Sequence, residues 1–151
     1  MRILLDADAF PNAVKEILFR AAERVKVNLI LVANVPLQIP ESSYISQITV
    51  AEGPDIADDK IVEIMEPGDL VITADIPLAD RAISKNGFAL NPRGELYTKE
   101  NIKEHLATRD LLADLRDSGM PIGGPKAFVQ KDRQNFANQL DRFLTKHLEK
   151  K

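Results

Sequence analysis

The sequence contains no cysteine and no tryptophan among its 151 residues, and only 5% of them are aromatic. The absence of cysteine excludes disulfides, thiolate zinc sites and cysteine nucleophiles, and nothing points to an oxidising compartment, so we expect a cytoplasmic protein. The only two histidines, His105 and His147, lie on helical stretches without partners at metal-ligand spacing. Both are therefore expected to be structural or solvated.

Long apolar runs are also absent. None approaches the roughly 20 residues that span a bilayer, so we expect neither a membrane partner nor a targeting segment. The hydrophobic fraction of 44% and charged fraction of 28% are ordinary for a globular protein, and the formal net charge is −3. Residues 126–151 hold seven Lys and Arg against three Asp and Glu, whereas residues 1–125 hold thirteen against twenty. An acidic body thus carries a basic C-terminal segment.

Apolar runs alternate with helical patterns along the chain. Buried strands are predicted at Ile3 to Leu5, Val27 to Ala33 and Asp69 to Asp75, with shorter ones at 48–50, 88–90 and 95–97. Helical spacing predicts helices after Pro11, from Asp55 to Met65, after Pro77, from a Thr98 cap to Asp117, and an amphipathic helix over 128–149. Residues 34–47 and the Gly/Pro-rich 118–127 read as loops. This order favours one three-layer α/β/α domain over 1–151 with a mainly parallel sheet.

Acidic residues follow two of the predicted strands. Ligands of open α/β sheets bind beyond the carboxyl ends of the strands, and Asp6 and Asp75 both stand at such ends. If the two strands are neighbours, their carboxylates converge. Neither residue has a helix terminus of its own on this interpretation, so the pair indicates a functional site.

Further carboxylates lie on the predicted helices. Asp55, Asp58 and Asp59 share one face of a first turn, and Asp80 stands five residues beyond Asp75. Gathered carboxylates repel each other and raise each other's pKa, so such a cluster is costly without a cation, and oxygen ligands select Mg²⁺ or Mn²⁺. Structural alternatives remain open: Asp8 and Asp55 as helix caps, and Asp58 and Asp59 as partners of a helix dipole.

Several segments together resemble one bacterial family. The segments are "LLDADAFPN", "GPDIADDKIV", "LVITADIPLADRAI", "NPRGELYT" and "GGPKAF" with the following "DRQNF". On these the chain resembles the uncharacterised YaiI/YqxD family over nearly its whole length. The fold of that family resembles the PIN-domain nucleases and is Rossmann-like. Its members commonly have Cys where this chain has Phe10, so no thiol is needed at that position here.

The resemblance implies a set of metal ligands. In the PIN superfamily, a strand-end aspartate, an acidic residue on a middle helix and an aspartate after Thr/Ser-x-Asp bind divalent metal. By position these roles fall on Asp6, on Asp58 or Asp59, and on Asp75 within "TAD", with Thr73 as the hydroxyl that orients Asp75 or as an ordinary strand threonine. The PIN pattern often has a further acidic residue where this chain has Pro77, and the resemblance leaves Asp80, one turn further on, as the candidate for that fourth ligand.

The chemistry implied is metal-assisted hydrolysis of phosphodiester bonds, with Asp6 and Asp75 as the catalytic carboxylates and RNA as the partner. Cations expected at the substrate phosphates are Arg93, Lys126, Lys131 and Arg133. Arg93 lies in the predicted turn "NPRG", where an arginine side chain can equally be solvated. The segment "GGPK" lacks the spacing of a nucleotide-phosphate loop.

Two other functions remain open on the sequence. Asp6-Ala7-Asp8 after a first strand also resembles the aspartyl phosphatases of the haloacid dehalogenase type, in which the first Asp is a nucleophile. That pattern needs a downstream lysine motif, which this chain lacks in convincing form. The other alternative is a non-catalytic RNA- or metal-binding module that keeps the carboxylates without turnover. The sequence does not indicate an oligomeric state.

Overall fold

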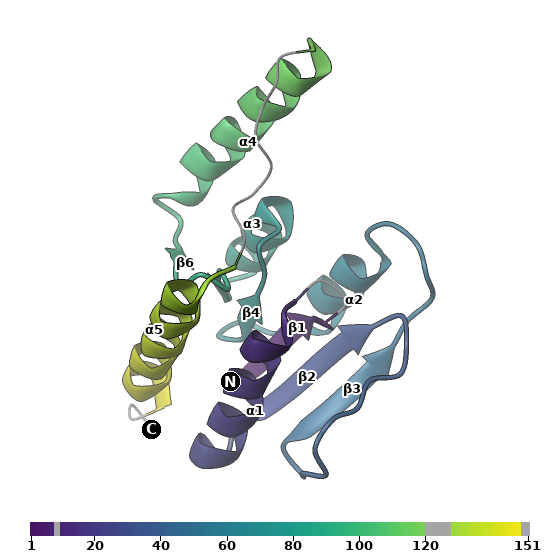
Figure 1. The fold of residues 1–151 in the computed structure, drawn as a ribbon, viewed down its shortest axis with the longest axis vertical. Helices are drawn as coiled ribbons and strands as arrows, with labels where there is room; N and C mark the ends of the chain where they lie inside the picture. The colour runs from purple at the N-terminus through teal and green to yellow at the C-terminus, as the bar shows by residue number, and fades with distance from the viewer. Residues whose placement is uncertain (8–9, 120–127, 149–151) are drawn as a thin grey trace.

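A six-stranded sheet organises the computed structural model, which describes residues 1–7, 10–119 and 128–148 (Figure 1). The strands are β1 (Arg2–Asp6), β2 (Asn28–Ala33), β3 (Ile45–Thr49), β4 (Leu70–Ile72), β5 (Phe88–Leu90) and β6 (Leu96–Tyr97). The helices are α1 (Asn12–Val25), α2 (Ile56–Ile64), α3 (Ile76–Ser84), α4 (Ile102–Asp117) and α5 (Gln130–Leu148).

The strand order is β3-β2-β1-β4-β5-β6, and every pair is parallel except the antiparallel pair of β5 and β6. The chain moves outward from β1 through β2 to β3, and then crosses to the other side of β1 to form β4 and β5. The order of strands therefore reverses between β1 and β4. In sheets of this kind the carboxyl ends of the strands at such a reversal form the usual place for a ligand.

Two apolar layers hold the helices on the sheet. One face, with Ile3 and Leu5 of β1, packs against Val14 and Leu18 of α1 and Phe136 of α5. The opposite face, with Leu4 of β1, packs against Ile61 of α2 and Leu78 of α3. Because successive residues of β1 point to opposite faces and both faces are covered, the strand reads as the continuous apolar run Ile3 to Leu5. The predicted three-layer α/β/α arrangement with a mainly parallel sheet is confirmed.

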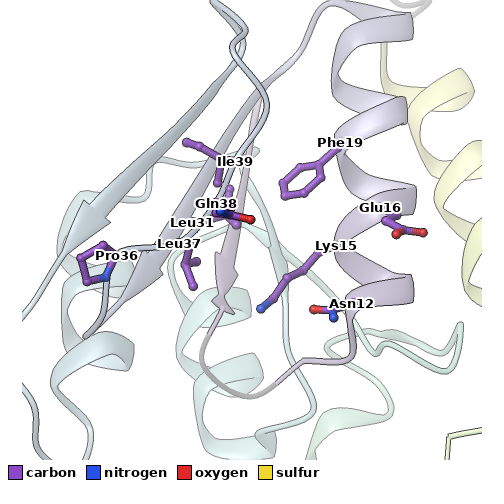
Figure 2. A pocket seen from close by; sticks show the side chains of 9 residues that line it. All are labelled: Asn12, Lys15, Glu16, Phe19, Leu31, Pro36, Leu37, Gln38 and Ile39. Atoms are coloured by element: carbon purple, nitrogen blue, oxygen red, sulfur yellow. The ribbon is translucent and has the colours of Figure 1, made fainter.

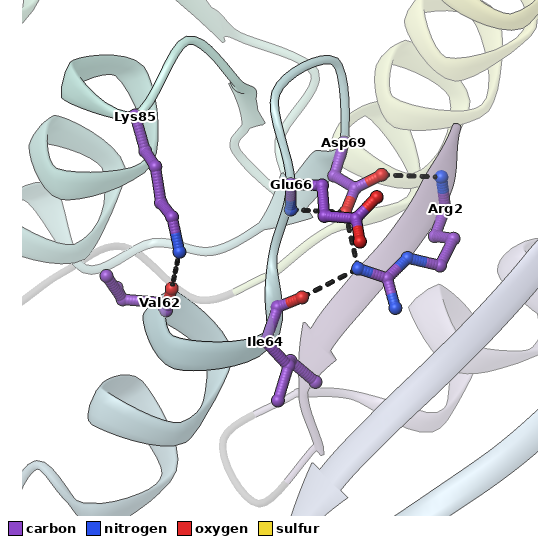
Figure 3. A network of polar contacts seen from close by, with 6 residues as sticks. All are labelled: Arg2, Val62, Ile64, Glu66, Asp69 and Lys85. Carbon is purple, nitrogen blue, oxygen red and sulfur yellow. Dashed lines mark hydrogen bonds and ion pairs between the residues drawn. The ribbon is translucent and has the colours of Figure 1, made fainter.

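The amino end of β1 is tied to the start of β4 by a polar network (Figure 3). The Asp69 side chain, 5% exposed, accepts hydrogen bonds from the backbone N–H of Arg2 at 2.9 Å and from the Arg2 guanidinium at 3.0 Å. The same guanidinium donates to the carbonyl of Ile64 at the end of α2, 2.7 Å away. A buried carboxylate with this many partners fixes the alignment of the two strands whose other ends carry the candidate site.

Several predicted boundaries were wrong. The strand predicted at Asp69 to Asp75 ends at Ile72, and β3 begins at Ile45, inside the stretch predicted as a loop over 34–47. Helix α4 begins at Ile102 rather than directly after Thr98, because Thr98 and Asn101 first exchange side chain to backbone hydrogen bonds in a turn. Of the predicted loop 118–127, only Ser118 and Gly119 lie within the described residues.

Figure 1 shows α4 leading away from the sheet, and beyond its first turns its side chains are largely exposed. No helix among the described residues is both long and apolar enough to cross a membrane.

Candidate functional site

Asp6 is the last residue of β1, and its strand lies directly beside β4. The register pairs Leu5 of β1 with Ile72, the last residue of β4. Asp75 follows Ile72 by three residues, so the carboxylates that follow the two apolar runs are carried to the same end of the sheet. We call this end, where β1, β2, β4 and β5 finish, the carboxyl end of the sheet.

Thr73 and Asp75 are held by a short hydrogen-bonded turn. The backbone N–H of Thr73 donates to the carbonyl of Leu90 at 3.0 Å, which extends the pairing of β4 with β5 by one residue. The Thr73 hydroxyl, on a side chain that is 2% exposed, accepts a hydrogen bond from the backbone N–H of Asp75 at 2.9 Å. Thr73 thus orients the backbone of Asp75.

Asp75 also caps α3, which corrects the expectation that no helix terminus accounts for it. Its Oδ1 accepts a hydrogen bond from the backbone N–H of Leu78 at 3.0 Å, the usual bond of an N-cap residue. The apolar pattern extends the predicted strand to Asp75, whereas the chain leaves β4 at Ile72. The cap occupies one carboxylate oxygen through this bond, and the carboxylate itself is exposed.

Asp58, in the first turn of α2, is the third carboxylate of this group. Partial burial, the negative charges of Asp75 and Asp6, and a side-chain hydrogen bond with Asp6 raise the pKa of Asp58 to about 6, with a smaller effect from the charge of Asp55. A hydrogen bond between two carboxyl groups needs a proton on one of them, which is why the protonated form of Asp58 is favoured. The charges of Asp6, Asp58 and Asp75 are therefore coupled.

The other acidic residues that the sequence predicted as ligands are not among these three coupled carboxylates. Asp59 accepts a hydrogen bond from Arg81 of α3 at 2.8 Å, so this ion pair joins the two helices. Asp80 lines a hollow between α3 and α4 together with Lys99 and Lys103. Asp55 occupies the N-cap position of α2 with φ of 62°, but its side chain makes no capping hydrogen bond. Asp8 lies outside the described residues.

Two of the predicted phosphate-binding cations, Arg93 and Arg133, lie at the start of α5. Arg93 donates to Asp132 at 2.7 Å, which ties the turn between β5 and β6 to the first turn of α5. Arg133 lies on α5, half-buried, and its side chain forms no ion pair within the part of the chain that the structure describes. Lys126 lies outside the described residues.

The donor chemistry at the carboxyl end of the sheet suits a hard divalent cation, since carboxylate oxygens are the ligands that Mg²⁺ and Mn²⁺ prefer. Within residues 1–7, 10–119 and 128–148, however, no three or more acidic or histidine side chains stand close enough together to hold an ion as they are placed. A shift of the carboxylates toward one another would be needed to complete a site. Their mutual repulsion opposes that shift unless a cation is present.

The sequence did not indicate a pocket on the face of the sheet that α1 covers. It lies between α1 and residues 36–39, which were predicted only as part of an irregular loop (Figure 2). Lys15 and Phe19, which line it, stand at i and i+4 on α1, so helical periodicity was the one signal that could have joined them. Nothing in the sequence placed the loop against that face.

The fold and the carboxylates define a class: an α/β protein with a mainly parallel sheet that carries acidic residues where the strand order reverses. The chain belongs to the YaiI/YqxD family. The family model described as "Uncharacterized BCR, YaiI/YqxD family" matches residues 4–146. The chain is 62% identical over 146 residues to a UPF0178 protein of Hahella chejuensis, covering 97% of each chain.

Two further relatives show the same near-complete coverage. A UPF0178 protein of Alkalilimnicola ehrlichii is 59% identical over 145 residues, which are 96% of this chain and 98% of that one. A UPF0178 protein of Maridesulfovibrio salexigens is 57% identical over 148 residues, which are 98% of each chain. No solved structure matches the chain. The predicted family is therefore confirmed, and the likeness to PIN domains stays a prediction.

Proposed function

We propose that this protein is a divalent-metal-dependent nuclease of PIN-like type that hydrolyses phosphodiester bonds, with RNA as its substrate. The observation that carries the proposal is the electrostatic coupling of Asp6, Asp58 and Asp75 at the point where the strand order reverses. Three carboxylates on a strand end, a helix start and a helix cap have no single structural reason to meet. Their positions also match the carboxylates that the resemblance to PIN domains singled out.

In this proposal Asp6, Asp58 and Asp75 hold Mg²⁺ or Mn²⁺. The ion would activate a water molecule and stabilise the charge that develops on the phosphate. The chain's own contribution is to fix its ligands. The Thr73 hydroxyl and the N–H of Leu78 orient Asp75, the sheet register sets Asp6 beside β4, and the first turn of α2 carries Asp58 toward both. Asp58 must lose its proton before it can serve as a ligand.

The direct test combines metal binding with cleavage. Calorimetry with Mn²⁺ is compared for the parent and for Asp6→Asn, Asp58→Asn and Asp75→Asn, and labelled single-stranded and structured RNA is incubated with Mn²⁺ or Mg²⁺. We expect each variant to lose Mn²⁺ affinity by at least tenfold and to lose cleavage. Asp114→Asn, on the exposed part of α4, is the matched control and should behave as the parent.

A second comparison tests which acidic residue of α2, Asp58 or Asp59, is the metal ligand. Asp59→Asn should keep Mn²⁺ binding, because Asp59 is engaged with Arg81, whereas Asp58→Asn should lose it. Parent-like Mn²⁺ binding in the variants of Asp6 and Asp75 would show that the site is assigned wrongly. Binding of Mn²⁺ without cleavage of any RNA would identify a metal-binding module, and a phosphate mimic trapped on Asp6 would identify a phosphatase.

A further inference from the structure

A cavity of about 430 Å³ opens between α1 and residues 36–39 (Figure 2). Its floor is Leu31 of β2, and its walls include Phe19 of α1 and Leu37 and Ile39 of the facing segment. This volume lies within the range of roughly 300–1,000 Å³ that is usual for small-molecule sites. The pocket is separate from the carboxylates of the proposed nuclease.

The lining changes from apolar to polar along α1. Phe19, Leu37 and Ile39 are partly buried against the main core, whereas Asn12 and Lys15 lie toward the beginning of the helix. Figure 2 shows Lys15 and Phe19 extending from α1 toward the facing segment. An occupant would therefore meet the Phe19 ring at one end of the α1 wall and Lys15 and Asn12 at the other.

Lys15 is half-buried and forms no ion pair with any residue that the structure describes. The carboxylate of Glu16, which also borders the pocket, points away from the facing segment in Figure 2. A half-buried ammonium group beside the apolar side chains of this pocket favours an anionic partner, because burial raises the cost of leaving the charge uncompensated. The pocket therefore favours a ligand that carries a negative charge next to an apolar group.

The wall opposite α1 is held in place by Gln47 of β3. Its Oε1 accepts a hydrogen bond from the backbone N–H of Leu37 at 2.9 Å, and its Nε2 donates to the carbonyl of Val35 at 2.7 Å. One side chain thus satisfies two backbone groups of the segment that forms the wall. The pocket is preformed, so little ordering is required when a ligand enters.

The sheet register shows that the pocket lies close to the proposed metal ligands. Leu31 on its floor pairs with Leu5, the residue before Asp6, and neighbouring strands lie about 4.8 Å apart. Leu5 belongs to the sheet face that α1 covers, whereas Asp6 is coupled to Asp58 of α2 on the opposite face. The pocket and the carboxylates therefore flank the same end of β1 from its two sides.

We propose that this pocket binds one nucleotide, with the base against Phe19, Leu37 and Ile39 and the phosphate at Lys15. A purely apolar ligand would leave Lys15 unpaired, and an inorganic anion would leave the apolar wall in water. The assignment of the nucleotide to an RNA strand rests on the proposed nuclease function. In this proposal the rest of the strand lies over the end of β1, next to the carboxylates.

The test is binding without metal, so that it does not depend on hydrolysis. Nuclear magnetic resonance titrations of the ¹⁵N-labelled full chain in EDTA use AMP, UMP, ribose 5-phosphate and inorganic phosphate. We expect AMP or UMP to shift the amide signals of residues 12–19 and 36–39, and ribose 5-phosphate to bind at least tenfold more weakly. A fluorescently labelled hexaribonucleotide should be displaced by the same nucleotide, which identifies RNA as the source of the ligand.

Two variants and a control test whether the nucleotide binds in this pocket. Lys15→Gln and Phe19→Leu should each weaken nucleotide binding on the order of tenfold, whereas Lys146→Gln, exposed on α5, should leave it unchanged. Thermal melting in the absence of ligand checks that each variant folds. Asp6→Asn should bind AMP or UMP as the parent does, which separates this inference from the proposed nuclease.

Three results would overturn the inference: no shift at residues 12–19 and 36–39, equal binding of ribose 5-phosphate, or unchanged affinity in a folded Lys15→Gln variant. Nucleotide binding that the hexaribonucleotide does not compete for would overturn its assignment to RNA.

Discussion

Asp58 shows how a single residue can couple the stability of this protein to pH. Its pKa in the folded chain is raised from the ordinary 3.8 to about 6, through burial first and then through the charges of Asp75 and Asp6. The folded state therefore binds this proton more tightly than the unfolded state does. The favourable contribution of protonated Asp58 is complete below pH 3.8 and is lost as the pH rises through 6.

We predict that Asp58→Asn stabilises the metal-free protein at pH 7.5, because it removes an ionised carboxylate that Asp6 and Asp75 repel. The side chain is half-exposed and screened by water, so the gain should be on the order of 1 kcal/mol. The gain should shrink as the pH is lowered from 7.5 to 4. Urea unfolding in EDTA at both pH values measures it, with Asp114→Asn as the control. An equal difference between variant and parent at both pH values would contradict the pKa assignment.

The individual residues of the site differed in how far the sequence predicted their surroundings. Asp6 could be placed at a strand end because the apolar run before it is continuous. The distinction between Asp58 and Asp59 could not be made, since it depends on which side of α2 faces β1 and on the position of Arg81. The pairing of Arg93 with Asp132 joins residues 39 positions apart, and no local pattern reports such a contact.

At the scale of elements, the start of α3 combines two tasks in one side chain. Asp75 caps the helix through Leu78 and is one of the proposed metal ligands. Asparagine is as good an N-cap as aspartate, whereas alanine is not. The two substitutions therefore separate the structural contribution of the residue from its charge.

We predict that Asp75→Asn leaves the free energy of unfolding in EDTA within about 0.5 kcal/mol of the parent, whereas Asp75→Ala lowers it by about 1 kcal/mol. Both variants should lose Mn²⁺ binding. Urea unfolding and calorimetry measure the two effects. If Asp75→Ala were as stable as Asp75→Asn, the cap would contribute nothing, and Asp75 would be held by other contacts.

Helices were more predictable than strand ends. The stripe Phe136, Leu140, Phe143 and Leu144 repeats at helical spacing, and all four side chains are buried in α5. The sequence pattern did not indicate the start of β3. Ile45-Ser46-Gln47 alternates at an edge of the sheet, and Gln47 binds the backbone of Leu37 in the preceding loop rather than filling the core. The polar Gln47 is explained by this tertiary contact. In the sequence alone, a polar residue at this position is typical of a loop.

For the molecule as a whole, the reversal of strand order brings distant segments to one end of the sheet. Asp6, Asp58 and Asp75 span 70 residues of sequence, yet they lie at the same end of the sheet because β1 and β4 are neighbours and α2 precedes β4. Alternating strands and helices predicted the parallel sheet. They did not predict that β6 would run antiparallel to β5 at the edge of the sheet.

The stability of the whole molecule should respond to metal in a pH-dependent way. A ligand that binds only the folded state stabilises it by mass action, by about 2.7 kcal/mol at a concentration 100 times the dissociation constant. For a chain of 151 residues this corresponds to a rise in melting temperature of roughly 5–10 °C. Because protons compete with the ion for Asp58, the rise should be large at pH 7.5 and small at pH 5.

Differential scanning calorimetry with saturating Mn²⁺ and with EDTA measures this rise at the two pH values. The parent and Asp114→Asn should both show it, and Asp6→Asn and Asp75→Asn should not. Asp58→Asn is the most informative variant, since it should melt higher than the parent in EDTA at pH 7.5 and yet gain little from Mn²⁺. A rise in melting temperature that is the same at pH 5 and pH 7.5, or that persists in all three variants, would mean that the ion binds elsewhere on the chain.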